Sequence, residues 1–397
     1  MKCFWKNPQS SFAALLLCVF GIKAAEPDYS KIPRPKDVPP PGNAKVKQSI
    51  ERGVYFLLER QNKDGSWGGP RNTKGLNIYA PTFQSHYAFR LAVTALSTSA
   101  LIEAGGDSPR VERAIEDGEK YLFEHLPKLR RATADAMYNV WSHAYAIQTL
   151  VRMRARLPKD KARIAKIDAL IRNQFDRLNR YESVDGGWGY YDFRVGTKKP
   201  ASDSISFVNG TVLHAFHEAK QAGIEPPKKL VTRAIAATKR QRLPDGSYLY
   251  GEYLKMQPRR GINRPGGSLG RSQCCNLALR LWGEKKITDK VMIDWLDRLF
   301  ARNGWLSIGR KRPRPHEAWF AVAGYFYFYG HYYAAHCIEM VPEPDKGRLQ
   351  DHLSTTLMKL QEKDGSWWDF PLYDYHQQYG TALTVMALQR CLKKKNK

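Results

Sequence analysis

The 397-residue sequence predicts an all-α protein in which six helical hairpins close into a ring. The main observation is a recurring turn, an Asp-Gly or Asn-Gly pair followed by an aromatic residue, which begins at positions 64, 185, 245, 303 and 364. The spacings are 121, 60, 58 and 61 residues, and the first equals two periods, so a sixth, degenerate unit belongs near residue 125. A fixed period of this kind indicates a repeat architecture.

Each repeat has the same internal plan, in which a charged amphipathic helix leads through the turn to a more apolar helix. We expect charged helices at residues 45–61, 161–178, 228–242 and 288–302. We expect apolar helices at residues 87–104, 141–154, 208–222, 273–282, 317–337 and 379–391. The apolar set should form an inner barrel inside the charged set. The end repeats carry the best-formed turns instead of polar caps, which favours a closed ring over an open solenoid.

The N-terminal 25 residues are typical of an export signal. Lys2 and Lys6 precede an apolar run at residues 12–22, and Ala24 and Ala25 offer a cleavage site. Eleven apolar residues are too few to span a bilayer, which needs about 20. We therefore expect an exported protein, periplasmic or secreted, with an uncleaved anchor as the alternative. Residues 26–44 hold six prolines and predict an extended tether before the ring at 45–392 and a basic tail at 393–397.

The formal net charge of +26 favours anionic partners such as phosphates, acidic glycans or an anionic membrane surface. The basic residues are spread along the chain and no nucleic-acid motif accompanies them, so no nucleic-acid partner is expected. Four cysteines remain beyond the signal, and we expect them to be buried free thiols.

The stretch from residue 52 to residue 67 fits the QW motif of terpenoid cyclases. The matching residues are Arg52, Gly53, Phe56, Leu57, Gln61, Gly65 and Trp67. Gln361, Gly365 and Trp367 give a second, partial match. Over about residues 45–392 the chain therefore resembles squalene–hopene cyclases and the β subunits of protein prenyltransferases. The resemblance implies an (α/α)6 toroid with a central cavity, and it is far more specific for fold than for function.

The repeated turn has a structural interpretation. Its Asp or Asn begins a tight turn that glycine completes with a positive φ. We expect the indole to pack against a neighbouring unit and the glutamine to bond backbone at a helix end. Since a closed ring brings the first and last units together, the two best copies lie far apart in sequence but side by side in space.

Several repeats place a histidine where the inner helix is expected to begin. These are His86, His143, His316 and His376. His316 and His376 are one period apart, so we expect them at equivalent points of adjacent inner helices, close enough to cooperate. Histidines at helix N-termini suit an anionic ligand or a metal. The alternative is that each histidine caps a helix or bonds a buried backbone group.

The prenyltransferase resemblance bears on the last two units. The family's zinc-binding histidine segment is matched by His376 and Tyr379, with Asp374 displaced by one position, and Arg310 matches an arginine that helps bind diphosphate. His316 and Ala318 stand where two other zinc ligands would be, so the zinc site is incomplete and the cofactor is unknown. We assign no metal, although two histidines and Glu317 would suit a different one.

The resemblance to squalene–hopene cyclases does not extend to the catalytic acid of those enzymes. Those enzymes protonate an alkene with an Asp-x-Asp-Asp motif, and this chain keeps a single Asp203 near that context. A working class II cyclase is therefore not expected. The segment at residues 319–336, however, holds nine Trp, Phe and Tyr residues in 18 positions and would suit the wall of an isoprenoid or sugar site.

We predict an exported toroid that binds an isoprenoid-like or other hydrophobic ligand, or lipid, with an anionic head, and the sequence leaves open whether it is an enzyme. Candidate catalytic residues are His376, His316, Asp374 and Tyr379. Candidate substrate-binding residues are Arg310, His86, His143 and Trp319. Two alternatives stay open: a carbohydrate-active toroid acting on acidic glycan, and a non-catalytic scaffold.

Overall fold

The structure, a computed structural model, describes residues 32–74, 83–129, 139–189 and 204–393. The predicted signal, most of the tether's first half and most of the basic tail lie outside these residues. The described residues from Pro33 onward belong to one compact unit. Its described residues form thirteen α-helices and no β-strand beyond isolated bridges. None of the described helices has the length and apolar character needed to cross a membrane.

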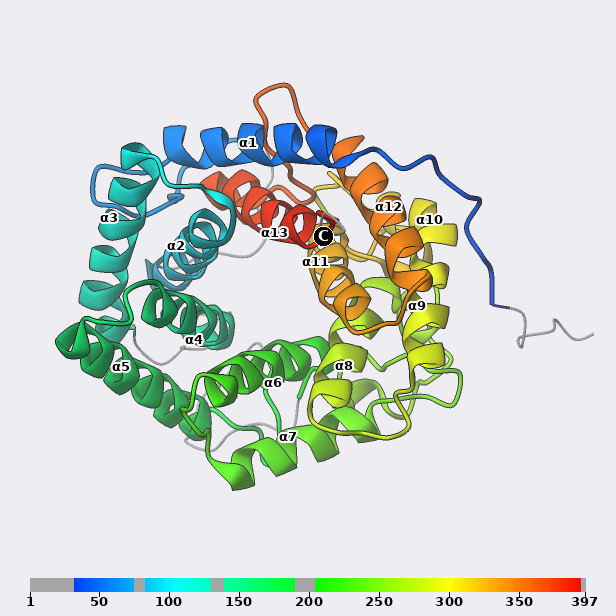
Figure 1. Ribbon diagram of the computed structural model, residues 1–397. Coiled ribbons are helices and arrows are strands. Elements are labelled where there is room, and N and C mark those ends of the chain that lie inside the picture. Colours follow the sequence, from blue (N-terminus) through cyan, green and yellow to red (C-terminus); the bar gives the residue numbers. More distant parts are fainter. Residues whose placement is uncertain (1–31, 75–82, 130–138, 190–203, 394–397) are drawn as a thin grey trace, which may run out of the picture. The chain divides into compact units, whose positions relative to one another are not determined.

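Twelve of these helices form two concentric rings (Figure 1). The outer helices are α1 (Asn43–Glu59), α3 (Pro109–His125), α5 (Lys161–Arg180), α7 (Lys228–Arg240), α9 (Asp289–Ala301) and α12 (Asp345–Met358). The inner helices are α2 (Phe83–Ala104), α4 (Asn139–Arg156), α6 (Ser206–Gln221), α8 (Leu269–Leu281), α11 (Phe326–Glu339) and α13 (His376–Arg390). The short α10 (Asn303–Ser307) follows α9. The predicted alternation of outer and inner helices is confirmed, including the degenerate unit at α3 and α4.

The ring closes where the last hairpin meets the first. Each inner helix packs against the next in chain order, and α13 packs against α2 and α1 (Figure 1). The side chain of Gln361 donates to the carbonyl of Ser49 at 2.9 Å, and Asn43 donates to the carbonyl of Lys393 at 2.7 Å. The predicted closed ring is therefore confirmed, and no end of the stack needs a polar cap.

The aromatic turn joins an outer helix to its own inner helix at positions 64, 185, 245 and 364, whereas Asn303 begins the short helix α10 instead of the predicted turn. The indole N–H groups of Trp67, Trp188 and Trp367 each donate to a carbonyl ten residues earlier, at 2.7–2.8 Å, near the end of the outer helix. All three indoles are fully buried. Each indole therefore adds a second bond to a carbonyl group in the last turn of its outer helix, which also accepts a backbone N–H three residues later.

The glutamine of the motif provides the bond between units. The Gln61 side chain donates to the carbonyl of Ala114 in α3 at 2.9 Å, as Gln361 does to α1. The indole also reaches the next unit, because a Cβ at Gly53 would lie 2.9 Å from the Trp367 ring. The repeat thus encodes both the turn and its docking on the neighbouring hairpin.

One helix begins later than predicted. Helix α11 starts at Phe326 rather than at residue 317. The preceding loop has positive φ at Lys311, His316, Phe320 and Ala321 (54–64°), which ends any helical path. His316 therefore lies ten residues before an inner helix rather than at its start, and the expected equivalence with His376, which does begin α13, is wrong.

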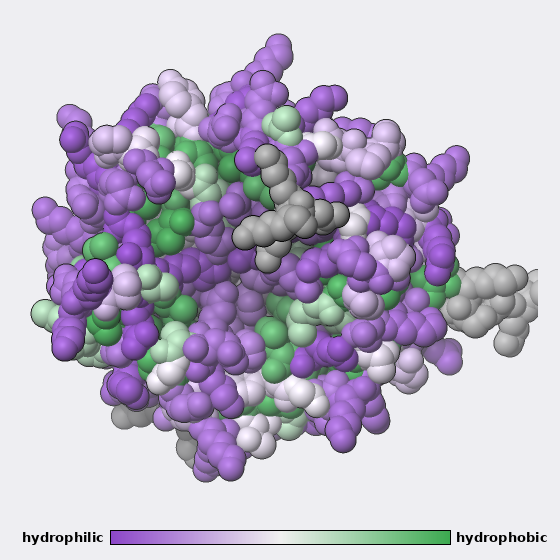
Figure 2. Space-filling model, viewed as in Figure 1, coloured by the Kyte–Doolittle hydropathy of each residue, from purple (hydrophilic) through white to green (hydrophobic). Residues whose placement is uncertain are grey.

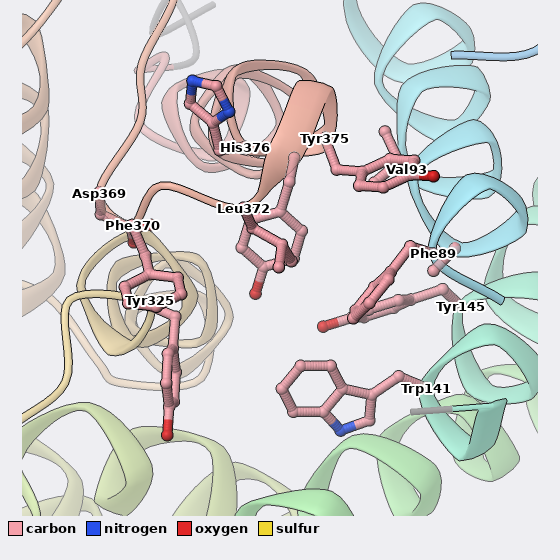
Figure 3. Close-up of a pocket in the computed structure, with 12 residues that line it drawn as sticks. Phe89, Val93, Trp141, Tyr145, Tyr325, Asp369, Phe370, Leu372, Tyr375 and His376 are labelled. Atoms are coloured by element: carbon pink, nitrogen blue, oxygen red, sulfur yellow. The ribbon is translucent and has the colours of Figure 1, made fainter. Parts of the chain in front are cut away.

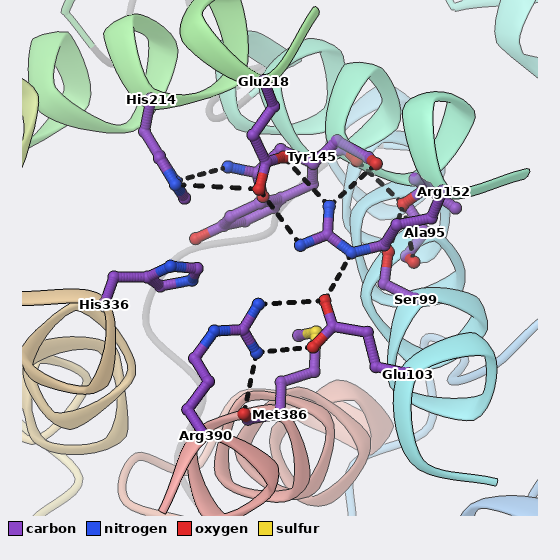
Figure 4. A network of polar contacts seen from close by, with 12 residues as sticks. Ala95, Ser99, Glu103, Tyr145, Arg152, His214, Glu218, His336, Met386 and Arg390 are labelled. Atoms are coloured by element: carbon purple, nitrogen blue, oxygen red, sulfur yellow. Dashed lines mark hydrogen bonds and ion pairs between the residues drawn. The ribbon is translucent and has the colours of Figure 1, made fainter. Parts of the chain in front are cut away.

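A cluster of charged and histidine side chains joins the C-terminal ends of the inner helices (Figure 4). Arg152 of α4 lies 2.5 Å from Glu103 of α2 and 2.9 Å from Glu218 of α6. Arg390 of α13 also pairs with Glu103. Burial alone would raise the pKa of Glu103, but the two arginines outweigh it and lower this pKa to about 2. In the view of Figure 2 the surface around the middle of the ring is mainly hydrophilic.

Replacing Gly365 with alanine should weaken the closing joint. Gly365 has φ +87°, and a Cβ there would lie 2.5 Å from the Arg52 carbonyl oxygen of α1. Gly223 has φ +83° with nothing within 4 Å, so Gly223→Ala controls for the backbone conformation alone. Urea unfolding should show Gly365→Ala to be less stable than this control by about 1–3 kcal/mol, the usual cost of overpacking. Equal stabilities would show that this contact does not hold the ring closed.

Candidate active site

A cavity of about 70 Å³ lies among the N-terminal ends of the inner helices (Figure 3). Since one water needs roughly 10–15 Å³, the cavity has room for several waters. Its wall is made by Phe89, Ala92, Val93, Trp141, Tyr145, Tyr325, Asp369, Phe370, Leu372, Tyr375, His376 and Tyr379. Seven of these twelve are Phe, Tyr or Trp, so the wall suits an apolar or unsaturated ligand.

Asp369 contributes the one carboxyl group on this wall among the described residues. Its Oδ2 accepts from the N–H of Phe328 at 3.0 Å and so caps the start of α11. Burial raises the pKa of Asp369 to about 7, although the Phe328 N–H and nearby Arg310 act in the opposite direction. A buried carboxyl that exchanges its proton near neutral pH is suited to acid or base work.

Tyr145 and Tyr379 are two of the four tyrosines on the cavity wall. The hydroxyl of Tyr145 lies among the lining side chains (Figure 3). Burial raises the pKa of both Tyr145 and Tyr379 well above the ordinary value, and the two phenols interact with each other. Both therefore stay neutral over the physiological range and serve as hydrogen-bonding groups rather than as ionised bases.

His376 lies on the wall but is committed to the protein. Its Nδ1 donates to the Tyr373 carbonyl at 2.5 Å, and its ring meets Trp368 edge-on at 5.2 Å between centroids. Burial lowers the pKa of His376 to about 4, so the ring is neutral at neutral pH. Its Nε2 is buried without a hydrogen-bond partner in the described residues.

His316 lies outside the cavity wall and shapes the loop before α11. One ring nitrogen bonds the Ala321 carbonyl at 2.7 Å, and the other bonds the Tyr325 hydroxyl at 3.1 Å. Burial lowers the pKa of His316. None of the hydrogen bonds or ring contacts of His316 involves His376, and its link to the cavity runs through the Tyr325 side chain.

Three other candidates lie just behind the wall. Asp374 pairs with Arg71 at 3.2 Å and is partly exposed. His86 bonds the Tyr375 hydroxyl at 3.1 Å from behind. Arg310 lies near Asp369 and 5.7 Å from the ring centroid of Tyr327. His86 and Arg310 act on wall residues, whereas the side-chain contacts of Asp374 are to Arg71 and Gln378, and none of the three is itself on the wall.

The remaining two candidates lie away from the cavity. His143 is fully buried, and its Nδ1 bonds the Gln174 side chain of α5 at 2.6 Å, so it faces the outer ring. Burial lowers its pKa to about 4. Trp319 is 67% exposed on the loop before α11.

The sequence interpretation missed Asp369, together with the contributions of Trp141 and Tyr145. The signal available was an acidic residue enclosed by apolar neighbours in the stretch WWDFPL at residues 367–372. Asp369 follows the turn that begins at Asp364, and the sequence correctly predicted a structural role for Asp364. The Asp364 side chain accepts from the Ser366 backbone N–H at 3.1 Å, as a turn former should.

The residues present do not form the prenyltransferase zinc site. Ala318 occupies the position of the thiolate ligand, and both ring nitrogens of His316 bond other groups. Within the described ranges, no three His, Cys, Asp or Glu side chains converge as a metal site would require. Cys274, Cys275, Cys337 and Cys391 are buried free thiols.

No protein-family model matches the chain, and no curated protein matches it in sequence. Among solved structures, the GH76A alpha-1,6-mannanase from Salegentibacter sp. HEL1_6 is similar with a TM-score of 0.55 and 10% identity, over 87% of this chain and 98% of that one. The type II terpene cyclase MstE from Scytonema, without ligand, is similar with a TM-score of 0.50 and 14% identity, over 89% and 99%.

A variant of MstE in complex with geranylgeranyl dihydroxybenzoate gives a TM-score of 0.51 and 14% identity, over 88% of this chain and 98% of that one. At such identities the similarity shows the fold alone. The chain is therefore an (α/α)6 toroid, a fold that serves both terpenoid and carbohydrate chemistry in these structures.

Proposed function

We propose that this chain is an exported toroid that binds an isoprenoid-like hydrophobic ligand in the aromatic cavity, where the protonated carboxyl of Asp369 donates its proton to an oxygen of the ligand and the resulting carboxylate regains a proton from solvent. The observation that supports the proposal is a wall whose described residues include seven aromatic side chains and one carboxyl group, which is buried. Aromatic rings accommodate apolar chains and stabilise positive charge that develops on them. A carboxyl with a pKa of about 7 retains a proton to donate at neutral pH.

The ligand's polar end has a different environment. Among the described residues, the cavity wall includes no Lys or Arg, whereas Arg310 lies beside Asp369 just behind it. An anionic head would therefore remain toward the rim, with the apolar part inside. The protein's high positive charge also favours a ligand drawn from an anionic surface.

The carbohydrate alternative has weaker support from the site. Hydrolysis of a glycosidic bond generally requires two carboxyl groups on opposite sides of the bond. Asp369 has no second carboxyl opposite it on the described wall, and Asp374 is engaged by Arg71. A purely structural role for Asp369 would be its cap at the start of α11, and the stability of Asp369→Asn separates that role from proton transfer.

Farnesol binding to the purified chain tests the proposal, with alpha-1,6-mannotetraose as the probe for the alternative. We expect farnesol to bind and quench tryptophan fluorescence, since Trp141 is on the wall. Ala92→Phe should reduce farnesol affinity at least tenfold because it fills the cavity, while leaving the circular dichroism spectrum unchanged. Binding of the mannotetraose but not of farnesol, or farnesol binding unaffected by Ala92→Phe, would contradict the proposal.

A further inference from the structure

Two loops at the cavity end of the ring pack together into one surface. They are residues 252–268, which lead into α8, and residues 302–325, which lead into α11. The 3-10 turns Gly261–Asn263 and Trp319–Ala321 contact each other, and a Cβ at Gly266 would lie 2.9 Å from the Phe320 ring. We call these two loops the paired-loop surface.

The paired-loop surface carries an unusual share of exposed apolar side chains. Nine large hydrophobic residues are exposed in the described part of the chain, and five of them lie here. They are Tyr253, Met256, Trp305, Ile308 and Trp319, with exposed fractions of 55, 84, 39, 45 and 67%. Phe320 connects Trp305 and Trp319, with ring centroids at 4.7 and 6.0 Å. Grouped exposed apolar residues of this kind mark interaction sites.

The same surface is strongly basic. The two loops contain nine lysines and arginines against two glutamates. Glu252 is buried and paired with Arg240 at 2.9 Å, and Glu317 lies 3.7 Å from Arg314. Arg259, Arg260, Arg312 and Arg314 are exposed. The partner should therefore present negative charge over a wide area.

The shape of the second loop is fixed before any partner binds. Four of its non-glycine residues have positive φ, a conformation that costs about 1–3 kcal/mol each. The His316 ring holds the loop in this form through its bonds to the Ala321 carbonyl and the Tyr325 hydroxyl. Tyr325 ends the loop and also lines the cavity, so the surface and the cavity adjoin.

We propose that the paired-loop surface docks the protein on a bilayer with anionic headgroups, with Trp319 and Met256 inserted at the interface. The surface of such a bilayer has phosphate groups above and apolar acyl chains below. The exposed arginines suit the phosphates, and the tryptophan and methionine side chains suit the acyl chains. Nucleic acid or an acidic glycan would engage the arginines but give the Met256 side chain no apolar partner. The inference rests on the proposed function in one respect, that a docked bilayer supplies the hydrophobic ligand to the adjoining cavity.

Vesicle co-sedimentation of the purified chain tests the inference. We expect binding to vesicles of phosphatidylglycerol and phosphatidylcholine and little binding to phosphatidylcholine alone. The double variant Trp319→Ala/Met256→Ser should reduce the partition coefficient at least tenfold. The control Tyr55→Ser/Leu157→Ser removes two exposed hydrophobics elsewhere and should leave it unchanged. Because the wild type and all variants share the same N-terminal segment, its contribution to vesicle binding cancels in each comparison.

Charge and insertion are separated by two further measurements. Arg312→Glu/Arg314→Glu should weaken binding and reduce its salt dependence. Lipids brominated on their acyl chains should quench tryptophan fluorescence in the wild type and less in Trp319→Phe. Equal vesicle binding by wild type and Trp319→Ala/Met256→Ser, or equal displacement by single-stranded DNA and by vesicles, would overturn the inference. Farnesol binding is measured on the same variants. Vesicle binding without farnesol binding would leave the inference intact and refute the proposed function.

Discussion

Replacing Arg152 with methionine should lower the free energy of unfolding by about 3–5 kcal/mol, the usual cost of breaking a buried ion pair. Arg152 is 11% exposed and lies between Glu103 and Glu218, so its loss leaves Glu218 without its guanidinium partner. His214, 3.7 Å from Glu218, does not replace the charge, because burial lowers its pKa to about 4. Urea unfolding at pH 7 measures the effect.

Arg154→Met is the matched control on the same helix. Arg154 pairs with Asp168 at 2.8 Å, but both side chains are partly exposed, at 32 and 26%. Such a pair contributes about 0–1 kcal/mol. Adding Glu218→Gln to Arg152→Met should restore part of the loss, because it removes the unpaired carboxylate. If the two single arginine variants unfold at the same urea concentration, the cluster does not hold the inner barrel together.

The charged cluster also explains why the two ends of the inner barrel differ. At the C-terminal ends of the inner helices, arginines and glutamates fill the space and satisfy one another (Figure 4). At the N-terminal ends, aromatic side chains leave a cavity beside Asp369 (Figure 3). Ionic contacts between α2, α4, α6 and α13 fix the spacing of the barrel at one end, so the other end can remain incompletely filled.

The fold could be predicted because it depends on a repeated local signal. The turns at Trp67, Trp188 and Trp367 use the same indole-to-carbonyl bond, and Gln61 and Gln361 each bond the neighbouring outer helix. A period near 60 residues therefore predicted the number of hairpins, and the strong end copies predicted closure. Local chemistry and global topology agree in these residues.

The site was harder to predict because its residues follow no period. The expectation for His316 assumed that the helix pattern continued through residues 317–325, whereas positive φ at Phe320 and Ala321 breaks it. His143 was placed correctly at the start of an inner helix, but its side chain turns toward Gln174 of the outer ring. The rotation of an inner helix about its own axis decides whether a side chain faces the cavity or the outer ring. The position of one histidine in the sequence does not determine that rotation.

Asp369→Asn should stabilise the protein at neutral and alkaline pH, by on the order of 2–4 kcal/mol at pH 8. The folded-state pKa of Asp369 is raised to about 7 from 3.8, so the folded protein holds a proton that the unfolded chain has released. Its stabilising effect is complete below pH 3.8 and is lost as pH rises toward 7. Asparagine stays neutral throughout and can still accept from the Phe328 N–H.

Asp364→Asn, a few residues away, should change the stability at neutral pH in the opposite direction. Partial burial alone would raise the pKa of Asp364, but hydrogen bonds from Ser366 and Gln377 lower it, so this substitution should cost stability at neutral pH. Urea unfolding of the three chains from pH 5 to 8.5 measures the difference, and effects of histidine titration cancel in each comparison with the wild type.

A gain in stability on loss of a carboxyl group would mean that Asp369 is retained for a purpose other than folding. Any turnover of an isoprenoid substrate should then fall at least a hundredfold in Asp369→Asn, because the amide has no acidic proton to donate. If Asp369→Asn instead destabilises the protein equally at pH 5 and pH 8, Asp369 acts only as the cap of α11. The proton-transfer part of the proposed function would then fail, while ligand binding by the aromatic wall would stand.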